Sequence, residues 1–123
     1  MGSKLVRKVR VAFVCTHNAC RSQMAEAIAR ELAGASLEPC SAGTHPAERV
    51  NADAIRALKR RHGIDATGLR PKALAEIEQV DVVVTMGCGV RCPVLPCAYR
   101  EDWGLEDPAG KGDDAFEACA CAI

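Results

Sequence analysis

The sequence predicts an α/β fold in which helices cover a parallel sheet, and three observations point to it. Strand-like apolar runs alternate with helical patterns, the runs over 8–15 and 80–86 are apolar almost throughout, and glycines at 34 and 63 end two of the helical patterns. Near-continuous apolar runs are typical of strands buried on both faces of a parallel sheet. Strands that alternate with helices form such sheets through right-handed crossovers.

The first predicted strand, 8–15, ends at a cysteine, Cys15. The stretch 22–34 that follows has the spacing of an amphipathic helix and ends at Gly34, a residue typical of helix C-termini. The side chains expected to face the core from this helix are Met24, Ala27, Ile28 and Leu32.

A second, shorter strand is predicted over 37–43, and we interpret its cysteine, Cys40, as a small buried apolar residue. Asn51 can cap the helix predicted over 52–63, because its side chain can accept a hydrogen bond from the first free N–H groups. That helix ends in a basic turn, which suits the negative end of a helix dipole.

The second half of the chain contains four more predicted elements. A short helix over 72–79 precedes the strongest strand signal, 80–86. An edge strand is expected around 97–101, and residues 113–123 have the pattern of a last short helix.

The chain is electrically balanced, with 16 basic and 16 acidic residues, so its overall field recruits neither nucleic acid nor an anionic membrane. No apolar stretch approaches the roughly 20 residues that span a bilayer, and residues 1–10 lack the pattern of a signal peptide. We therefore expect a cytoplasmic, monomeric protein with one domain over 1–123, in which 1–8 is a candidate flexible end.

The chain contains eight cysteines, which in a secreted protein would suggest a disulfide scaffold. Such scaffolds are smaller and richer in loops, so thiols that react or bind metal are the better interpretation here. Apart from Cys40 the cysteines form three groups: Cys15 and Cys20, then Cys88, Cys92 and Cys97, and finally Cys119 and Cys121. The last pair is interpreted as incidental to a short terminal helix.

The segment 15–22, "CTHNACRS", predicts a site for a tetrahedral oxyanion; we call it the oxyanion loop. Sites in parallel sheets form where the carboxyl ends of strands turn into helices, and Cys15 lies at such an end. The loop can direct backbone N–H groups inward beside the positive end of the next helix, and Arg21 can hold two oxygens at once. These groups also favour the thiolate form of Cys15, which is the nucleophilic form. The predicted oxyanion-binding residues are Thr16, His17, Asn18, Ala19, Cys20, Arg21 and Ser22.

Four of these loop residues have more specific expected roles. Asn18 tolerates a left-handed backbone, which suits the tight middle of the loop. Ser22 can donate its hydroxyl to the sulfur of Cys15. Cys20 is expected to pack rather than react, and His17 is expected at the rim of the pocket.

The motifs resemble a known family. "VCTHNACRSQMAEA", residues 14–27, resembles the phosphate loop of the low-molecular-weight protein tyrosine phosphatase superfamily, and "DVVVTMGC", "CPVLP" and "DWGLEDPAGK" resemble its thioredoxin-coupled arsenate reductase branch. The match runs from about Val9 to Lys111. The resemblance implies a three-layer fold with a four-stranded parallel sheet flanked by helices. It also implies that Asp107 is the general acid that protonates the leaving oxygen.

The resemblance further implies a disulfide relay. Cys15 attacks arsenate, Cys88 attacks the adduct and releases arsenite, and Cys92 then attacks Cys88. Thioredoxin, as an external reductant, reduces the last disulfide. No tightly bound cofactor is implied, and phosphate or sulfate would occupy the loop as mimics of arsenate.

Two other functions stay open on these residues. A phosphatase needs Cys15, Arg21 and Asp107 and no other thiol, although the phosphatase branch commonly has tyrosines after its Asp-Pro, where this chain has "AGKG". A protein that binds zinc or arsenite through Cys88 and its neighbours is the other alternative. The spacing of these thiols differs from the paired C-x2-C of structural zinc sites.

The chain departs from the family pattern within the relay, because only "GVR" separates Cys88 from Cys92. The better-studied reductases have a longer polar loop there. Residues four apart can approach the roughly 5.5 Å between Cα atoms that a disulfide prefers. Aligning "CPVLP" and its distance to Asp107 with the family makes Cys92 the third thiol that the resemblance implies, and Cys97 is the alternative.

Relatives can hold a potassium ion behind the phosphate loop, and three residues here resemble its ligands: Glu26, Ser41 and Asp65. The alternative is that these side chains only brace the loop. The sequence also leaves open whether thioredoxin or a small thiol is the reductant.

Overall fold

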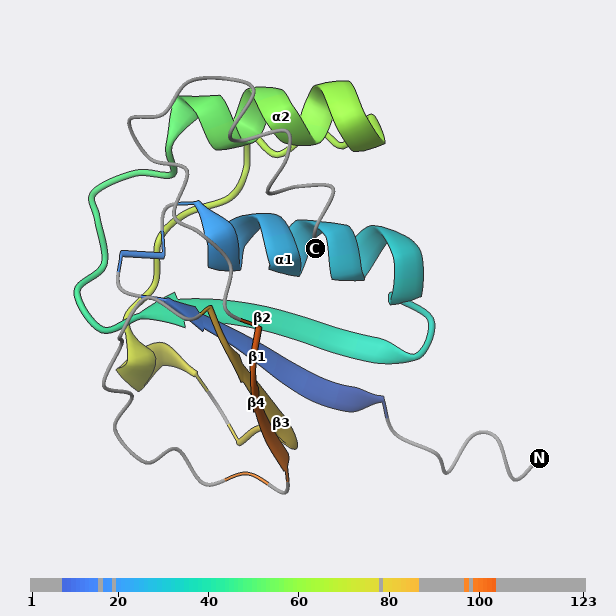
Figure 1. Ribbon diagram of the computed structural model, residues 1–123, viewed down its shortest axis with the longest axis vertical. Coiled ribbons are helices and arrows are strands. Elements are labelled where there is room, and N and C mark those ends of the chain that lie inside the picture. The colour runs from blue at the N-terminus through green and yellow to red at the C-terminus, as the bar shows by residue number, and fades with distance from the viewer. Residues whose placement is uncertain are drawn as a thin grey trace.

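The computed structural model describes residues 8–15, 17–18, 20–77, 79–86, 97 and 99–103. These residues contain a parallel four-stranded sheet with the strand order β2-β1-β3-β4 (Figure 1). The strands are β1 (Val9–Cys15), β2 (Leu37–Gly43), β3 (Val82–Thr85) and β4 (Tyr99–Asp102). The helices are α1 (Arg21–Ala33), α2 (Ala52–His62) and the short 3₁₀ helix η2 (Leu74–Glu76). The predicted parallel sheet flanked by helices is confirmed.

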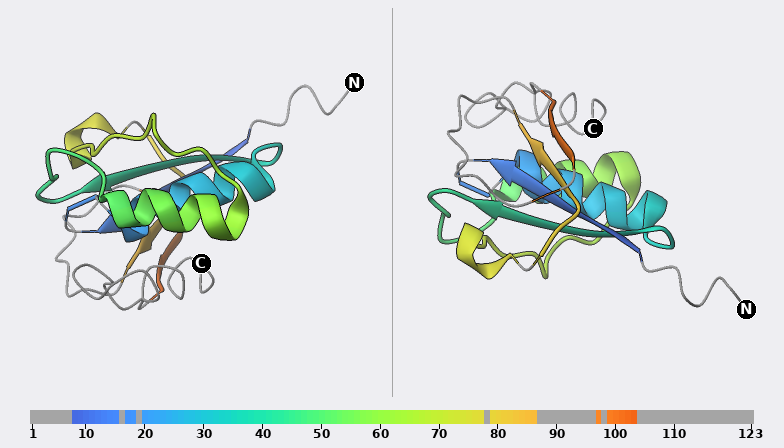
Figure 2. Two further views of the ribbon diagram at one scale, coloured as in Figure 1. Left: turned by 90° about the horizontal axis from the view of Figure 1, so that it is seen from above. Right: turned by 90° about the horizontal axis from the view of Figure 1, so that it is seen from below.

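The helices and the sheet pack in layers through their apolar faces. Helix α1 lies on one face of the sheet, and α2 packs on the outer side of α1 (Figures 1 and 2). An apolar cluster that includes Met24, Ile28 and Leu58 joins the two helices. The opposite face of the sheet is covered, within the described residues, by η2 and the chain that follows it.

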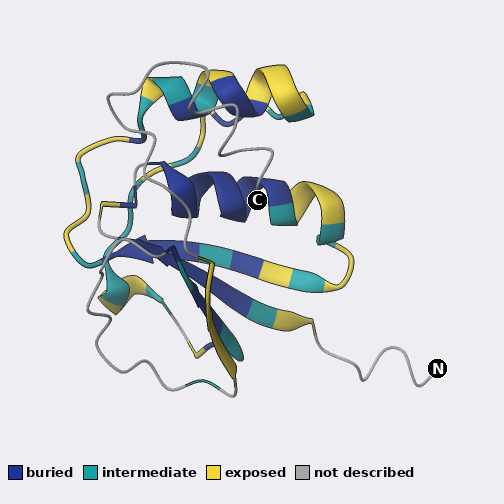
Figure 3. Ribbon diagram, in the orientation of Figure 1, coloured by how far each residue is buried: buried dark blue, intermediate teal, exposed yellow. Residues whose placement is uncertain are grey.

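Strand β1 is buried on both faces from Val11 to Cys15, as its apolar run predicts (Figure 3). Val11 and Phe13 point toward α1, whereas Val14 points toward the other face and packs in the cluster that Leu74 joins. Phe13 also meets the ring of Trp103, which follows β4, with the ring centroids 5.4 Å apart. The centre of the sheet is therefore a rigid support for the residues at its carboxyl edge.

Helix α2 has the predicted start and stop signals. The Asn51 side chain accepts a hydrogen bond of 2.8 Å from the N–H of Asp53. Gly63 has a φ of 66° and donates its N–H to carbonyls of the last turn, a left-handed cap that glycine adopts without steric cost. Among the described residues, none of the helices has the length and apolarity that crossing a membrane requires.

Three expectations about local structure were wrong. The helix predicted over 72–79 is only the three-residue η2, because Lys72 accepts the N–H of Gly43 instead of joining a helix. Leu32 is 74% exposed, because the last turn of α1 extends past the surfaces that cover its first turns (Figure 3). Cys40 is half-buried rather than buried. The helix predicted over 113–123 lies outside the described residues.

Candidate functional site

The sulfur of Cys15 lies between the end of a strand and the start of a helix. Cys15 ends β1, pairs with Gly43 of β2, and is only 3% exposed. Helix α1 begins at Arg21, and the Cys20 side chain does not cap the positive end of the helix. The Sγ of Cys15 is 2.9 Å from the Oγ of Ser22 in the first turn of α1.

Hydrogen bonds around Asn18 leave the Ser22 hydroxyl able to donate to the sulfur of Cys15. The backbone N–H of Lys72 can only donate, so the Asn18 side-chain atom 2.8 Å away is the acceptor, Oδ1. The amide nitrogen of Asn18 therefore faces Ser22 and donates to its Oγ at 2.7 Å. This contact uses one lone pair of Ser22 Oγ and leaves its O–H available for the sulfur of Cys15. A hydroxyl donor at this place can stabilise negative charge that develops on the sulfur.

Asn18 itself has the left-handed conformation that its residue type suggested. Its φ is 51°, and it is the only residue other than glycine with a positive φ in the described part of the chain. Its side chain is fully buried. The strain of this conformation is offset by the three hydrogen bonds that the side chain makes.

Gln23 is a supporting residue that the sequence analysis missed. It is fully buried, and its Nε2 donates to Asn18 Oδ1 at 2.8 Å and to the Arg70 carbonyl at 2.6 Å. The signal in the sequence is a polar residue beside Ser22 in the buried first turn of α1. Gln23 and the backbone of 70–72 together hold Asn18 in place.

Arg21 lies at the same edge of the sheet and is 3% exposed. Its Nη1 donates to the carbonyl of Met86, the residue after β3, at 3.0 Å. The guanidinium is therefore anchored to the carboxyl end of the strand that neighbours β1. A buried thiol, a helix N-terminus and an anchored guanidinium together can bind an oxyanion and attack its central atom.

The side chains of His17 and Cys20 lie in different surroundings. His17 is exposed, and its Nδ1 is 3.2 Å from the carbonyl of His45. Its own carbonyl accepts the N–H of Ala47 at 2.9 Å, which ties the loop to the chain after β2. The thiol of Cys20 is buried in the apolar cluster between α1 and α2.

Cys97 lies far from Cys15 in the described conformation. It precedes β4 and packs on the face of the sheet that η2 covers, whereas Cys15 belongs to the cluster on the α1 face. Tyr99, where β4 starts, pairs with Val82 at the amino end of β3. Several other predicted residues lie outside the described residues: Thr16, Ala19, Cys88, Cys92, Asp107, Cys119 and Cys121.

The three residues that resemble potassium ligands are not brought together. The Ser41 hydroxyl donates to Glu26 Oε1 at 2.6 Å, and both side chains are buried. Asp65 is elsewhere, in a turn where its carboxylate accepts the N–H and hydroxyl of Thr67. These bonds from Thr67 lower the pKa of Asp65. Within the described ranges, no group of three His, Cys, Asp or Glu side chains could hold a metal ion.

Replacing Ser22 by alanine tests the hydroxyl donor. We expect Ser22→Ala to slow the alkylation of Cys15 by iodoacetamide at pH 7 roughly tenfold, the worth of one charge-assisted hydrogen bond. Mass mapping of peptides follows Cys15 separately from the other thiols. Ser36→Ala, at an exposed position, is the matched control and should leave the rate unchanged. Alkylation of Ser22→Ala at the parent's rate would show that Ser22 does not act on the sulfur.

Comparison with known proteins gives consistent matches over most of the chain. The family model described as low molecular weight phosphotyrosine protein phosphatase matches residues 10–123. An arsenate reductase from Staphylococcus xylosus is 41% identical over 117 residues, which cover 89% of this chain and 86% of that protein. A solved arsenate reductase in its phosphate-binding state has a TM-score of 0.84 at 34% identity, with 93% of this chain and 89% of that chain covered. A thioredoxin-dependent arsenate reductase from Corynebacterium glutamicum has a TM-score of 0.73 at 33% identity, covering 98% of this chain and 61% of that chain.

Proposed function

The chain belongs to the low molecular weight phosphotyrosine protein phosphatase family, and from this premise we propose that it reduces arsenate to arsenite with electrons from thioredoxin. The observation that carries the proposal is the buried Cys15 sulfur, 2.9 Å from a hydroxyl that can donate to it. The similarity to an arsenate reductase at 41% identity favours arsenate as the oxyanion.

In the first step the Cys15 thiolate attacks the arsenic of bound arsenate. A sulfur–arsenic bond forms, an arsenic–oxygen bond breaks, and Asp107 protonates the departing oxygen. Arg21 and the N–H groups of the oxyanion loop hold the remaining oxygens, so that negative charge is stabilised as the bond forms.

In the second step the Cys88 thiolate attacks the sulfur of Cys15. A disulfide forms, the sulfur–arsenic bond breaks, and its electron pair stays on arsenic, which leaves as arsenite. The two thiols thus supply the two electrons of the reduction. Cys92 then attacks Cys88, frees Cys15, and leaves a disulfide that thioredoxin reduces.

The position of Cys97 supports Cys92 as the third thiol. Cys97 precedes the first residue of β4. Cys15 comes after Val14, whose partner in β3, Thr85, pairs with the last residue of β4. Three residue steps along β4 alone separate the two ends by about 10 Å. The two thiols also belong to clusters on opposite faces of the sheet.

A turnover assay tests the proposal. The purified protein is mixed with arsenate, thioredoxin, thioredoxin reductase and NADPH, and a parallel sample receives an aryl phosphate instead. We expect NADPH oxidation that depends on arsenate. If the protein only hydrolyses the aryl phosphate, it is a phosphatase and the proposal is wrong. Turnover with a glutathione and glutaredoxin mixture but not with thioredoxin would replace the proposed reductant.

The change Arg21→Lys tests whether the Arg21 guanidinium holds the oxyanion in the oxyanion loop. A lysine keeps the charge but cannot hold two oxygens in one plane, and the bond to the Met86 carbonyl would lose its geometry. We expect kcat/KM for arsenate to fall roughly 30-fold or more, the loss of one or two charge-assisted hydrogen bonds. Arg49→Lys, at an exposed arginine, is the matched control. Arsenate turnover in Arg21→Lys at the parent's rate would contradict this role of Arg21.

A further inference from the structure

A buried carboxylate lies one turn after Ser22 in α1. Glu26 is 5% exposed, and two polar groups bind it: the Ser41 hydroxyl at 2.6 Å from Oε1 and the Arg30 guanidinium at 2.9 Å from Oε2. The ammonium of Lys72 is 3.4 Å from Oε1. Because a buried charge is costly unless it is paired, these contacts decide how well Glu26 is tolerated.

Lys72 connects this carboxylate to the oxyanion loop. Its N–H donates to Asn18 Oδ1 at 2.8 Å, and its carbonyl accepts the N–H of Gly43 at 2.8 Å. The side chain is 20% exposed, and its Nζ also donates to the Arg70 carbonyl at 3.1 Å. The charge of Lys72 therefore anchors the same backbone that orients Asn18, and Asn18 orients the hydroxyl beside Cys15.

A potassium ion, which the family can hold in this region, does not fit the residues present. Asp65 is in an exposed turn and does not join Glu26 and Ser41. The place beside the carboxylate is taken by the Lys72 ammonium, which would repel a second cation at that distance. The positive charge that Glu26 needs is thus already part of the chain.

We propose that Lys72 is the built-in cation of the oxyanion loop, so that this protein works without an alkali metal ion. Lys72 is a positioning residue: it holds Glu26 and Asn18 and does not touch the oxyanion. The consequence for turnover rests on the proposed arsenate reduction, whereas the consequence for stability does not.

Two substitutions of Lys72 separate charge from space. Lys72→Ala removes the charge and opens room beside Glu26, Ser41 and the Arg70 carbonyl, whose oxygens are the ligands that hard cations prefer. Lys72 and Ser41 both line a pocket of about 260 Å³ that is open to solvent, so an ion can enter. Lys72→Met removes the charge but fills the space. Lys59→Ala, at an exposed lysine of α2, is the matched control.

The variants are compared in potassium chloride and in choline chloride at equal ionic strength. For the parent and Lys59→Ala we expect kcat/KM for arsenate to agree within about twofold between the two salts, and the midpoint of thermal unfolding to stay the same. In choline we expect both Lys72 variants to lose about tenfold in kcat/KM, as for one charge-assisted contact. Potassium should raise the kcat/KM of Lys72→Ala several-fold. It should also raise the unfolding midpoint of this variant, because an ion bound only to the folded state stabilises that state. It should restore neither property in Lys72→Met.

Three results would overturn this proposal. The first is a parent whose turnover or unfolding midpoint rises with potassium over choline. The second is a Lys72→Met variant with the kcat/KM and unfolding midpoint of the parent, since an uncharged side chain would then position the loop as well as lysine does. The third is a Lys72→Ala variant whose unfolding midpoint potassium does not raise. If the parent shows no arsenate turnover at all, the proposed function fails, and the unfolding midpoints still decide the role of Lys72.

Discussion

Cys15→Ser is expected to abolish arsenate reduction, with turnover at least about a thousandfold below the parent. An alcohol is hardly ionised at neutral pH, so it cannot replace the thiolate as the nucleophile or as the first electron donor. The Ser22 hydroxyl 2.9 Å away is not a base that could activate a serine. The measurement is arsenate-dependent NADPH oxidation with the thioredoxin system, together with hydrolysis of an aryl phosphate.

Two controls separate lost chemistry from lost structure. Cys15→Ser should still bind sulfate, measured by titration calorimetry, because Arg21 and the start of α1 are unchanged. Cys40→Ser is the matched substitution: burial, with Glu26 nearby, raises the pKa of the Cys40 thiol, so it is a poor nucleophile at neutral pH. Its arsenate turnover should equal that of the parent. Turnover by Cys15→Ser above a few per cent would remove Cys15 from its proposed role.

The second large effect is expected from the relay thiols, which act after the oxyanion has bonded to Cys15. Cys88→Ala should lose arsenate reduction, because nothing attacks the adduct, and should still cleave an aryl phosphate slowly. Cys92→Ala should stop one step later, with a disulfide between Cys15 and Cys88 after a single turnover. Mass mapping of peptides from the arsenate-treated variant detects that bond.

Cys97→Ala is the control for the relay. Because Cys97 lies at the amino end of β4, on the other face of the sheet from Cys15, we expect this variant to turn over repeatedly. The opposite pattern, with repeated turnover by Cys92→Ala and a trapped disulfide in Cys97→Ala, would identify Cys97 as the third thiol.

The elements that the sequence predicted well are those with strong local signals. β2 has the predicted bounds, and α2 is fixed by a side-chain cap at Asn51 and a left-handed Gly63. The predicted helix over 72–79 failed because a long-range contact competes with local preference. Lys72 bonds to Gly43 and Asn18, residues that are far away in the sequence.

The same division holds for the candidate site. The Cys15 to Ser22 contact and the left-handed Asn18 follow from a short motif within one loop. The hydrogen bond from Lys72 that orients Asn18 does not follow from that motif, because the two residues are 54 positions apart. The local sequence does not show that Asp65, which resembles a potassium ligand, lies away from Glu26. It also does not show that the Lys72 ammonium lies beside Glu26.

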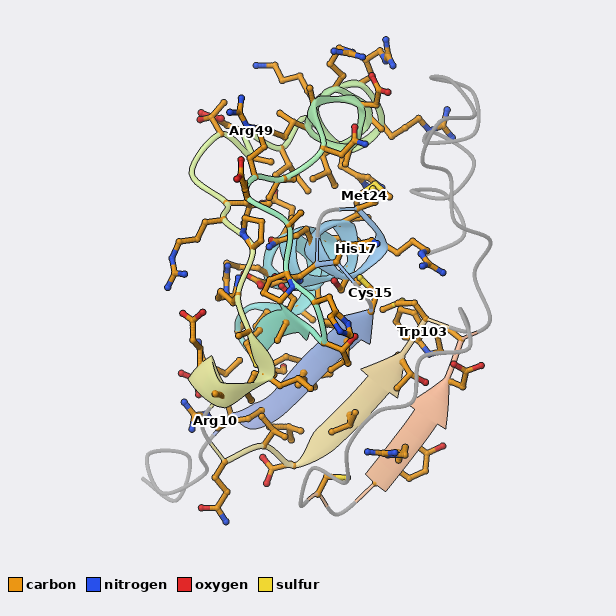
Figure 4. All side chains as sticks on the ribbon, turned by 90° about the vertical axis from the view of Figure 1, so that its left-hand side faces the viewer. Arg10, Cys15, His17, Met24, Arg49 and Trp103 are labelled. Carbon is orange, nitrogen blue, oxygen red and sulfur yellow. The ribbon has the colours of Figure 1, made fainter. Side chains whose placement is uncertain are left out.

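The contact between Phe13 and Trp103 has a practical consequence. Trp103 is the only tryptophan in the sequence, and its backbone N–H donates to the carbonyl of Thr85 at 2.8 Å. It follows β4 at the sheet edge where β1 ends in Cys15 (Figure 4). Indole emission responds to nearby charge, polarity and thiols, and the one indole of the protein lies at the edge where an oxyanion would bind. Anion binding and thiol oxidation can therefore be followed optically in real time on the unlabelled protein.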